Sequence, residues 1–345
     1  MDRPYNRWRW ELWVVVAILL AAAALRLIDL SDVPPGLRYD ELLNYRMAQR
    51  VLTGDTPLYF TESWGHEPLF HYAQAGALAL VGHSDWSLRL PAVVFGLLSV
   101  LTSWLVARRL FGTRVALLTA GGLALSFWSV FYSRDGLRGI TVVPLTCLMV
   151  YFLWQGFRLG KLSAYLSAGI FLGSAFYTYM AARAFPALPA AFALYLLLLH
   201  RRRFKKTWWG LLLAVIVGLL LAAPLLYRVY GPSGAEQRVQ QLAGAWQALQ
   251  AGDPQPVLNL ALRAAGMFVW QGQEDWLYNV AGRPIFDPLS ALPFLLGMGL
   301  CLWRWKQPQA ALLLVWLVVG LAPTLIAEPP ASISHAIAAQ PPTYM

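Results

Sequence analysis

The sequence predicts an all-α polytopic membrane protein with about nine transmembrane helices and short surface helices in its outer loops. Hydrophobic residues make up 58% of its 345 residues, whereas an average soluble domain contains roughly 45–50%. Several apolar runs approach the length of about 20 residues that crosses a bilayer as a helix. Short basic clusters separate these runs, as in the loops of membrane proteins. We expect a single membrane domain over residues 1–345.

The predicted spans follow one another with short connections. They cover residues 12–30, 89–107, 115–132, 140–157, 164–182, 184–199, 208–227, 288–303 and 310–327. Alternation along the chain puts the basic clusters together on one face: the N-terminus, 108–114, 158–161, 201–206 and 304–306. The positive-inside rule then predicts a cytoplasmic N-terminus in the plasma (inner) membrane. The net charge of +10 reflects this topology, and we expect no nucleic-acid partner.

Two long segments, residues 31–88 and 228–287, fall on the opposite, outer face. Surface helices are expected in them over residues 40–52, 67–81, 236–251 and 258–269. The stretch at 67–81 is apolar but too short for a span, which indicates a re-entrant or surface helix. The two helices of the second segment would form either a packed outer cap or a platform for a bound molecule.

Adjacent carboxylates, Asp40 and Glu41, open the first surface helix directly after the first span. Acidic side chains are favoured in a first helical turn by the free N–H groups there. Their position at the mouth of a membrane helix, in a chain with only 17 acidic residues, also indicates a functional site. A positioned carboxylate can act as a general base.

The same topology places further polar side chains on the outer face, namely His66, Glu67, Arg134, Arg138, Tyr177, Tyr179 and Arg183. The arginines are candidates for binding phosphate through forked donors, although arginines at helix ends also serve as interfacial anchors. His66 and His71, together with a carboxylate such as Glu41, are candidate ligands for a divalent metal, and a simple hydrogen bond is the alternative. The tyrosines fit an aromatic belt or a surface on which a ligand stacks.

Six stretches resemble the polytopic GT-C glycosyltransferases that use a polyprenyl-phosphate sugar, the group of protein O-mannosyltransferases and lipid A aminoarabinose transferases. The matching stretches are Tyr39-Asp40-Glu41, residues 66–72, residues 89–112, Tyr132-Ser133-Arg134 with Arg138, Tyr177-Thr178-Tyr179 with Arg183, and residues 282–288. The resemblance covers nearly the whole chain. Relatives continue with more helices that contribute to the donor groove, so we expect this chain to be a fragment, a short member or an inactive relative.

The resemblance implies transfer of a sugar from a polyprenyl-phosphate donor to an acceptor hydroxyl of a lipid, glycan or protein. Asp40 would be the base of a single, inverting displacement on the extracytoplasmic face. Glu41 would position the acceptor or the base, or ligate a metal; some members of the group carry a metal and others do not.

Three other functions remain consistent with parts of the sequence. A lipid-linked sugar transporter or flippase would need ionisable groups inside the membrane, and few fall there. A non-catalytic membrane relative of the transferases would dispense with Asp40 and Glu41. An O-antigen ligase or polymerase would rely on basic outer residues, which the early acidic pair argues against.

Overall fold

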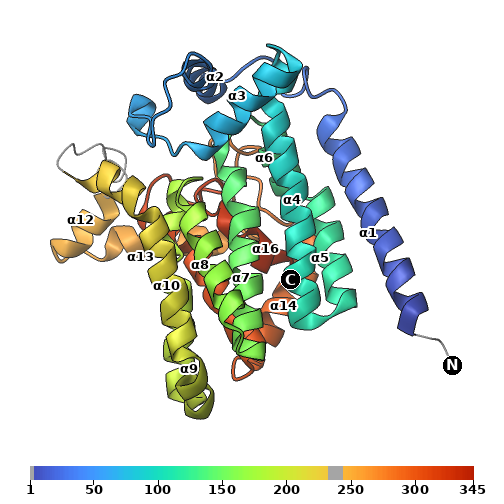
Figure 1. The fold of residues 1–345 in the computed structure, drawn as a ribbon, viewed down its shortest axis with the longest axis vertical. Helices are drawn as coiled ribbons and strands as arrows, with labels where there is room; N and C mark the ends of the chain where they lie inside the picture. Colours follow the sequence, from blue (N-terminus) through green and yellow to red (C-terminus); the bar gives the residue numbers. More distant parts are fainter. Residues whose placement is uncertain (1–3, 232–243) are drawn as a thin grey trace.

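The computed structural model describes residues 4–231 and 244–345, and every regular element in these ranges is a helix (Figure 1). The α-helices are α1 (Pro4–Leu27), α2 (Tyr39–Leu52), α3 (Leu69–Val81), α4 (Asp85–Phe111), α5 (Thr113–Leu125), α6 (Phe127–Arg134), α7 (Val142–Leu159), α8 (Leu162–Ala175), α9 (Ala187–Leu199), α10 (Arg201–Tyr230), α12 (Gly244–Gln250), α13 (Gln255–Gly266), α14 (Pro288–Trp303), α15 (Pro308–Ile326) and α16 (Gln340–Tyr344). Short 3-10 helices lie at Glu62–Trp64, Arg138–Thr141, Met180–Ala184 and Ile337–Ala339.

Six helical segments are long and apolar enough to cross a membrane, which confirms an integral, polytopic, all-α protein. They are Trp10–Leu27, Asp85–Phe111, Arg138–Leu159, Met180–Leu199, Arg201–Tyr230 and Pro308–Ile326. A seventh is added if α5 and α6, which meet at a bend of 54°, count as one span. The predicted number of nine is not confirmed, because α8 and α14 are apolar but only 14 and 16 residues long. The chain after α8 turns at residues 176–179 instead of continuing as a helix.

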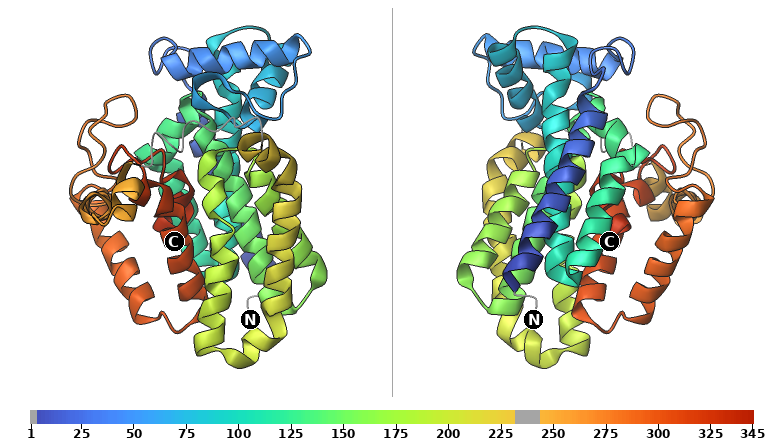
Figure 2. Two further views of the ribbon diagram at one scale, coloured as in Figure 1. Left: turned by 90° about the vertical axis from the view of Figure 1, so that its left-hand side faces the viewer. Right: turned by 90° about the vertical axis from the view of Figure 1, so that its right-hand side faces the viewer.

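The basic turns after α4, α7, α9 and α14 lie at one end of the bundle, and α2 and α3 form a layer across the other end (Figure 2). The predicted surface helices at 40–52 and 67–81 correspond to α2 and α3. In the second long segment, α13 corresponds to the stretch predicted at 258–269. The predicted helix at 236–251 lies partly outside the described residues, and its described part contains α12.

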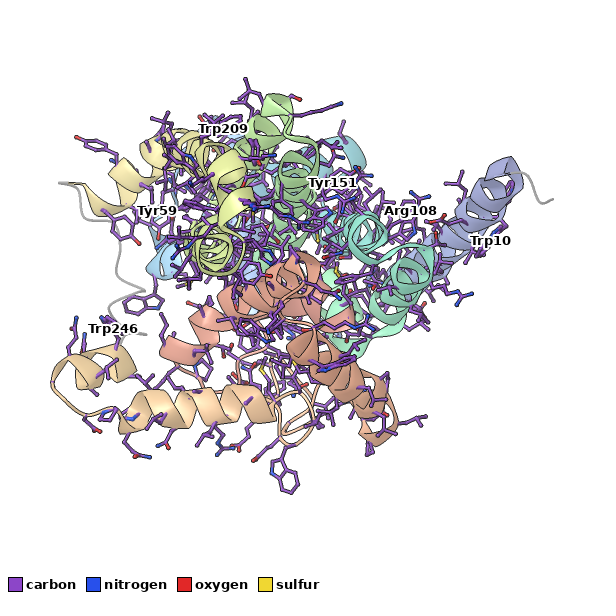
Figure 3. All side chains as sticks on the ribbon, turned by 90° about the horizontal axis from the view of Figure 1, so that it is seen from below. Trp10, Tyr59, Arg108, Tyr151, Trp209 and Trp246 are labelled. Atoms are coloured by element: carbon purple, nitrogen blue, oxygen red, sulfur yellow. The ribbon has the colours of Figure 1, made fainter. Side chains whose placement is uncertain are left out.

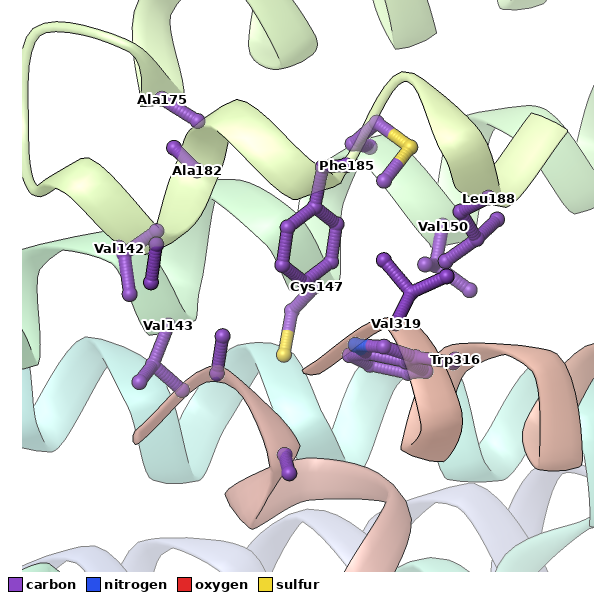
Figure 4. Close-up of a cluster of buried hydrophobic side chains, with 14 of the residues drawn as sticks. Val142, Val143, Cys147, Val150, Ala175, Ala182, Phe185, Leu188, Trp316 and Val319 are labelled. Carbon is purple, nitrogen blue, oxygen red and sulfur yellow. The ribbon is translucent and has the colours of Figure 1, made fainter. Parts of the chain in front are cut away.

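The bundle packs around α7, whose buried Cys147 faces side chains of α15 and of the turn before α9 (Figure 4). Close approach of α8 and α10 depends on glycines: a Cβ on Gly173 would lie 2.6 Å from Leu221 Cβ and 2.8 Å from the Gly218 carbonyl. Small residues at such contacts let membrane helices approach and gain dispersion energy. Helix α1 stands at the margin of the bundle (Figure 3). There Arg108 of α4 binds Glu11 at 2.6 Å.

The break between α5 and α6 is stabilised by Arg26 of α1, a fully buried cation. Its guanidinium donates to the carbonyls of Leu123 and Ala124 at 3.2 and 3.0 Å and to Ser129 Oγ at 2.9 Å. Carbonyls at a helix end lack intrahelical partners, and leaving them unsatisfied in hydrocarbon costs several kcal/mol. Arg26 therefore allows α6 to bend away and to carry the turn at Asp135 beneath α2.

Helix α2 is attached to the bundle by a buried ion pair between Glu41 and Arg89. Both side chains are fully buried, and Arg89 Nε lies 2.8 Å from Glu41 Oε1. Glu41 also accepts from the backbone N–H of Gly136 at 3.1 Å. Arg89 donates in addition to the carbonyls of Leu30 and Pro34, both at 2.9 Å. One pair thus joins α2, the start of α4, the connection after α1 and the turn after α6.

A second link lies beside the first. Arg38, the residue before α2, binds Asp135 at 2.8 Å, and Asn44 Nδ2 donates to the Gly136 carbonyl at 2.7 Å. Burial raises the pKa of the Asp135 carboxyl to about 7, although Arg38 acts in the opposite direction. Asp135 therefore gains a proton far more readily than an exposed aspartate does.

We predict that Arg89→Gln destabilises the protein strongly, because it leaves Glu41 as a buried charge without its partner. Breaking a buried pair in this way costs about 3–5 kcal/mol. The matched control is Arg50→Gln, which removes partly exposed pairs with Asp55 and Glu62 that contribute about 0–1 kcal/mol. Thermal unfolding of both variants in one detergent measures the difference, and equal midpoints would contradict the anchoring role of Arg89.

We also predict a pH dependence of stability that Asp135 causes. The folded protein keeps this proton up to about pH 7, whereas the unfolded chain releases it near pH 4. The folded state then binds more protons between these values, so the stability due to this group falls as pH rises from about 4 to about 7. Asp135→Asn should flatten the thermal midpoint measured across this range, while Asp55→Asn should keep the wild-type slope. Parallel profiles for all three proteins would refute the assignment.

Candidate active site

A polar pocket of about 210 Å³ lies between the outer layer and the bundle. Its walls come from α2, the turn after α6, the turn after α8, the segment after α13 and the chain after α15. Among the lining residues are Asp40, Asn44, Arg138, Tyr179, Tyr278 and His335. Segments separated by up to about 300 residues thus meet around one space.

The two adjacent acids of α2 point to different places. Successive residues of an α-helix are turned by about 100°, so the ion pair that takes Glu41 inward leaves Asp40 facing the pocket. Asp40 is half-buried, and its Oδ2 accepts a hydrogen bond from the Tyr278 hydroxyl at 2.8 Å. Of the pair, only Asp40 presents its carboxylate to the pocket.

Glu67 forms ion pairs with two of the predicted arginines, Arg138 and Arg183. Its carboxylate lies 3.0 Å from Arg183 Nη2 and 3.3 Å from Arg138 Nε, and the Glu67 side chain is buried. Arg138 lies over the ring of Tyr179, with its guanidinium carbon 5.5 Å from the ring centroid. Arg183 lies over Tyr230 at 5.6 Å and donates to its hydroxyl at 3.0 Å. Two cations share one anion, so this cluster keeps a net positive charge beside the pocket.

A second, largely apolar groove of about 440 Å³ adjoins the polar pocket. It is lined by side chains of α15, the turn before α9 and the end of α10, with Arg183 as a cationic lining residue. Tyr179 and His335 line both spaces. A carboxylate, a cationic cluster and an apolar groove are therefore neighbours, an arrangement suited to an amphiphile with an anionic head group.

Arg134 and Tyr177 lie outside both pockets. Arg134 donates to the carbonyls of Leu25 and Asp29 at 2.8 and 3.0 Å and so caps the end of α1. The Tyr177 hydroxyl donates to the Leu221 carbonyl of α10 at 2.8 Å. Both side chains satisfy backbone groups.

The two histidines predicted as candidate metal ligands contact each other. His66 Nδ1 lies 3.2 Å from His71 Nε2, and the rings stack with centroids 5.3 Å apart. Burial, with a contribution from Arg138, lowers the pKa of His71 to about 3, so this ring is neutral at pH 7. Glu41 is engaged with Arg89. In residues 4–231 and 244–345, no group of three or more His, Cys, Asp or Glu side chains is arranged to hold a metal ion.

Four residues of the site were not predicted as site residues from the sequence: Arg38, Arg89, Tyr278 and His335. The partners of Arg89 and Tyr278 lie 48 and 238 positions away along the chain. A basic residue followed by Leu-Pro at the start of a span reads as an interfacial anchor. Tyr278 follows Trp276-Leu277 in a loop and carries no recognisable signal. A single sequence offers no means of pairing these residues.

Comparison with known proteins gives one family and a set of solved structures. The family of dolichyl-phosphate-mannose-protein mannosyltransferases matches residues 65–227. Among curated protein sequences none matches the chain.

The archaeal oligosaccharyltransferase AglB from Archaeoglobus fulgidus, solved with an inhibitory peptide and a dolichol-phosphate, is similar over 99% of this chain and 50% of its own, with a TM-score of 0.61 and 15% identity. ArnT from Cupriavidus metallidurans, bound to undecaprenyl phosphate, is similar over 99% of this chain and 60% of its own, with a TM-score of 0.61 and 18% identity. This chain thus spans about half to three-fifths of these proteins. The fold that this chain shares with the two structures, and the mannosyltransferase match over residues 65–227, agree with the resemblance to the GT-C glycosyltransferases.

Proposed function

We propose that the protein is a membrane glycosyltransferase that moves a sugar from a polyprenyl-phosphate donor to an acceptor hydroxyl, with Asp40 as the general base. The observation that carries this proposal is the junction of the Asp40 pocket with the apolar groove at Tyr179 and His335. The similar structures of AglB with dolichol-phosphate and of ArnT with undecaprenyl phosphate support a donor of this class.

The groove suits the donor lipid. Its apolar wall takes the first part of the polyprenyl chain, and the rest of the chain stays in the bilayer. The phosphate then lies near Arg183 and Arg138, whose forked N–H donors fit phosphate oxygens. Glu67 holds both arginines in place and lowers the local charge. The sugar extends past Tyr179 toward Asp40.

The reaction is a single displacement. The acceptor oxygen attacks the anomeric carbon as its proton passes to the Asp40 carboxylate, and the bond from that carbon to the phosphate oxygen breaks. The products are the glycosylated acceptor and polyprenyl phosphate, and attack opposite the leaving group inverts the anomeric centre. The charge that develops on the leaving phosphate is stabilised by the arginine cluster. Glu41 acts as a positioning residue through Arg89.

The basic turns of the bundle support a cytoplasmic N-terminus in the plasma membrane and an extracytoplasmic active site, by the positive-inside rule. In this scheme no step passes through a metal. One structure of the Archaeoglobus fulgidus oligosaccharyltransferase is a complex with Zn and sulfate, so the transfer assay includes an arm with chelator.

Asp40→Asn should abolish measurable transfer, because loss of a general base costs about 10²- to 10⁴-fold in rate. The assay uses purified protein in nanodiscs with a panel of radiolabelled polyprenyl-phosphate sugars. Asp55→Asn, an exposed aspartate of the outer layer, is the matched control and should retain wild-type turnover. Retained transfer by Asp40→Asn would eliminate Asp40 as the base. Movement of labelled lipid across the membrane without transfer would favour a flippase.

Arg183→Gln should weaken donor binding roughly tenfold or more, the value of a hydrogen bond to a charged group. The expected signature is a higher KM for the donor at unchanged KM for the acceptor. Arg46→Gln, which alters an exposed arginine of α2, is the control. The variants are compared by titrating donor at saturating acceptor, and a donor KM equal to that of wild type would remove Arg183 from the donor site.

A further inference from the structure

We propose that Tyr278 is the gate of the acceptor site: its hydroxyl holds the position on Asp40 that an acceptor hydroxyl takes, and acceptor entry displaces the loop that carries it. The proposal rests on the proposed function and deepens it, since it assigns a residue that decides which hydroxyl reaches the base. Water is the competitor that such a gate excludes.

Tyr278 is in direct contact with Asp40. The Tyr278 hydroxyl lies 2.8 Å from Asp40 Oδ2, within the range of about 2.6–3.2 Å that a proton donor to a general base occupies. Both residues line the pocket of about 210 Å³. The phenol is a neutral O–H donor, the same kind of group as the acceptor hydroxyl of the proposed reaction. The Asp40 carboxylate thus accepts from an internal hydroxyl at the position proposed for the acceptor hydroxyl.

The loop that carries Tyr278 is closed at its neck. Gly272 N–H donates to the Gly282 carbonyl at 3.1 Å, and Gly282 N–H donates to the Gln273 carbonyl at 3.0 Å. Asn279 Nδ2 adds bonds to the carbonyls of Gln273 and Arg283 at 3.0 and 2.8 Å. The connection between α13 and α14 stands out from the bundle (Figure 2). Residues 274–278 thus form a tip that can move while the neck, including Asn279, stays paired.

The tip is attached to the residue that precedes α2. Arg38 donates to the Leu277 carbonyl and pairs with Asp135 at 2.8 Å. Arg38 directly precedes the helix that presents Asp40, so the tip is held against the same turn that carries the base. Trp276, the neighbouring side chain, is 74% exposed, so the tip gives up little buried apolar area when it moves.

The gate would prevent water from hydrolysing the donor. If water took the acceptor position, its oxygen would attack the anomeric carbon, its proton would pass to Asp40, and the products would be free sugar and polyprenyl phosphate. With the Tyr278 hydroxyl on Asp40, this position is filled until a larger acceptor with its own binding contacts displaces the tip. Excluding water from an active site suppresses this side reaction.

The test compares Tyr278→Phe, which keeps the ring and removes the hydroxyl, with Tyr72→Phe, which removes an outer-layer hydroxyl bonded to the Pro57 carbonyl. The first measurement is the rate at which a carbodiimide with glycine ethyl ester modifies Asp40 in the full chain, read by mass spectrometry. We expect a roughly tenfold increase in Tyr278→Phe, the value of a hydrogen bond to a charged group, and none in Tyr72→Phe. An unchanged rate in Tyr278→Phe overturns the gate.

The second measurement uses donor turnover. Tyr278→Phe should release free sugar in the absence of acceptor several-fold faster than wild type, with a lower KM for the acceptor and an unchanged kcat at saturation. Wild-type transfer with unchanged hydrolysis in the variant overturns the gate and leaves the transferase in place. Loss of kcat in Tyr278→Phe also overturns it, because Tyr278 would then be catalytic. Absence of transfer by wild type overturns the proposed function, and the labelling of Asp40 still decides whether Tyr278 covers it.

Discussion

The buried ion pair between Glu41 and Arg89 is the interaction on which the outer layer depends. Burying two charges is costly, and the cost is offset only when each charge is paired and its remaining hydrogen-bonding capacity is filled. Both conditions hold here, because backbone groups of three connections bind the pair. The orientation of α2 follows from this contact, and with it the direction of Asp40. One acid of the adjacent pair is thus used for architecture, and the other remains available to the pocket.

The arginines of this chain have two different roles, binding backbone carbonyls or sharing a carboxylate. Arg26 and Arg134 bind backbone carbonyls at helix ends, where they replace partners that hydrocarbon cannot supply. Arg138 and Arg183 instead share one carboxylate, Glu67, and leave a positive charge next to an apolar groove. All four stand near helix ends in the sequence. Their roles differ because of what lies opposite them, which is a property of tertiary structure.

The parts of the fold that local sequence determines were predictable. Apolar runs and basic clusters predicted the all-α membrane class, and turn residues predicted α2 and α3 to within two residues. The count of spans was not predictable, because hydropathy does not show that the chain leaves the helix at residues 176–179 to bring Tyr179 to the pocket. Among site residues, the clustering of Glu67, Arg138 and Arg183 followed from topology. Arg134 and Tyr177 point elsewhere, and Tyr278 meets Asp40 across 238 positions, which no local pattern encodes.

Tyr179 and His335 line both the polar pocket and the apolar groove, so the two spaces meet at this shared wall. Under the proposed function, one reactant arrives by lateral diffusion within the bilayer and the other arrives from water. The effective concentration of the donor is then its mole fraction among the membrane lipids, a surface quantity, and adding inert lipid slows the reaction although the amounts of enzyme and donor stay constant. Saturation by the acceptor follows ordinary bulk concentration. Under the proposed function, the rate therefore depends on the donor's mole fraction in the membrane and on the acceptor's concentration in water, and each is diluted independently of the other.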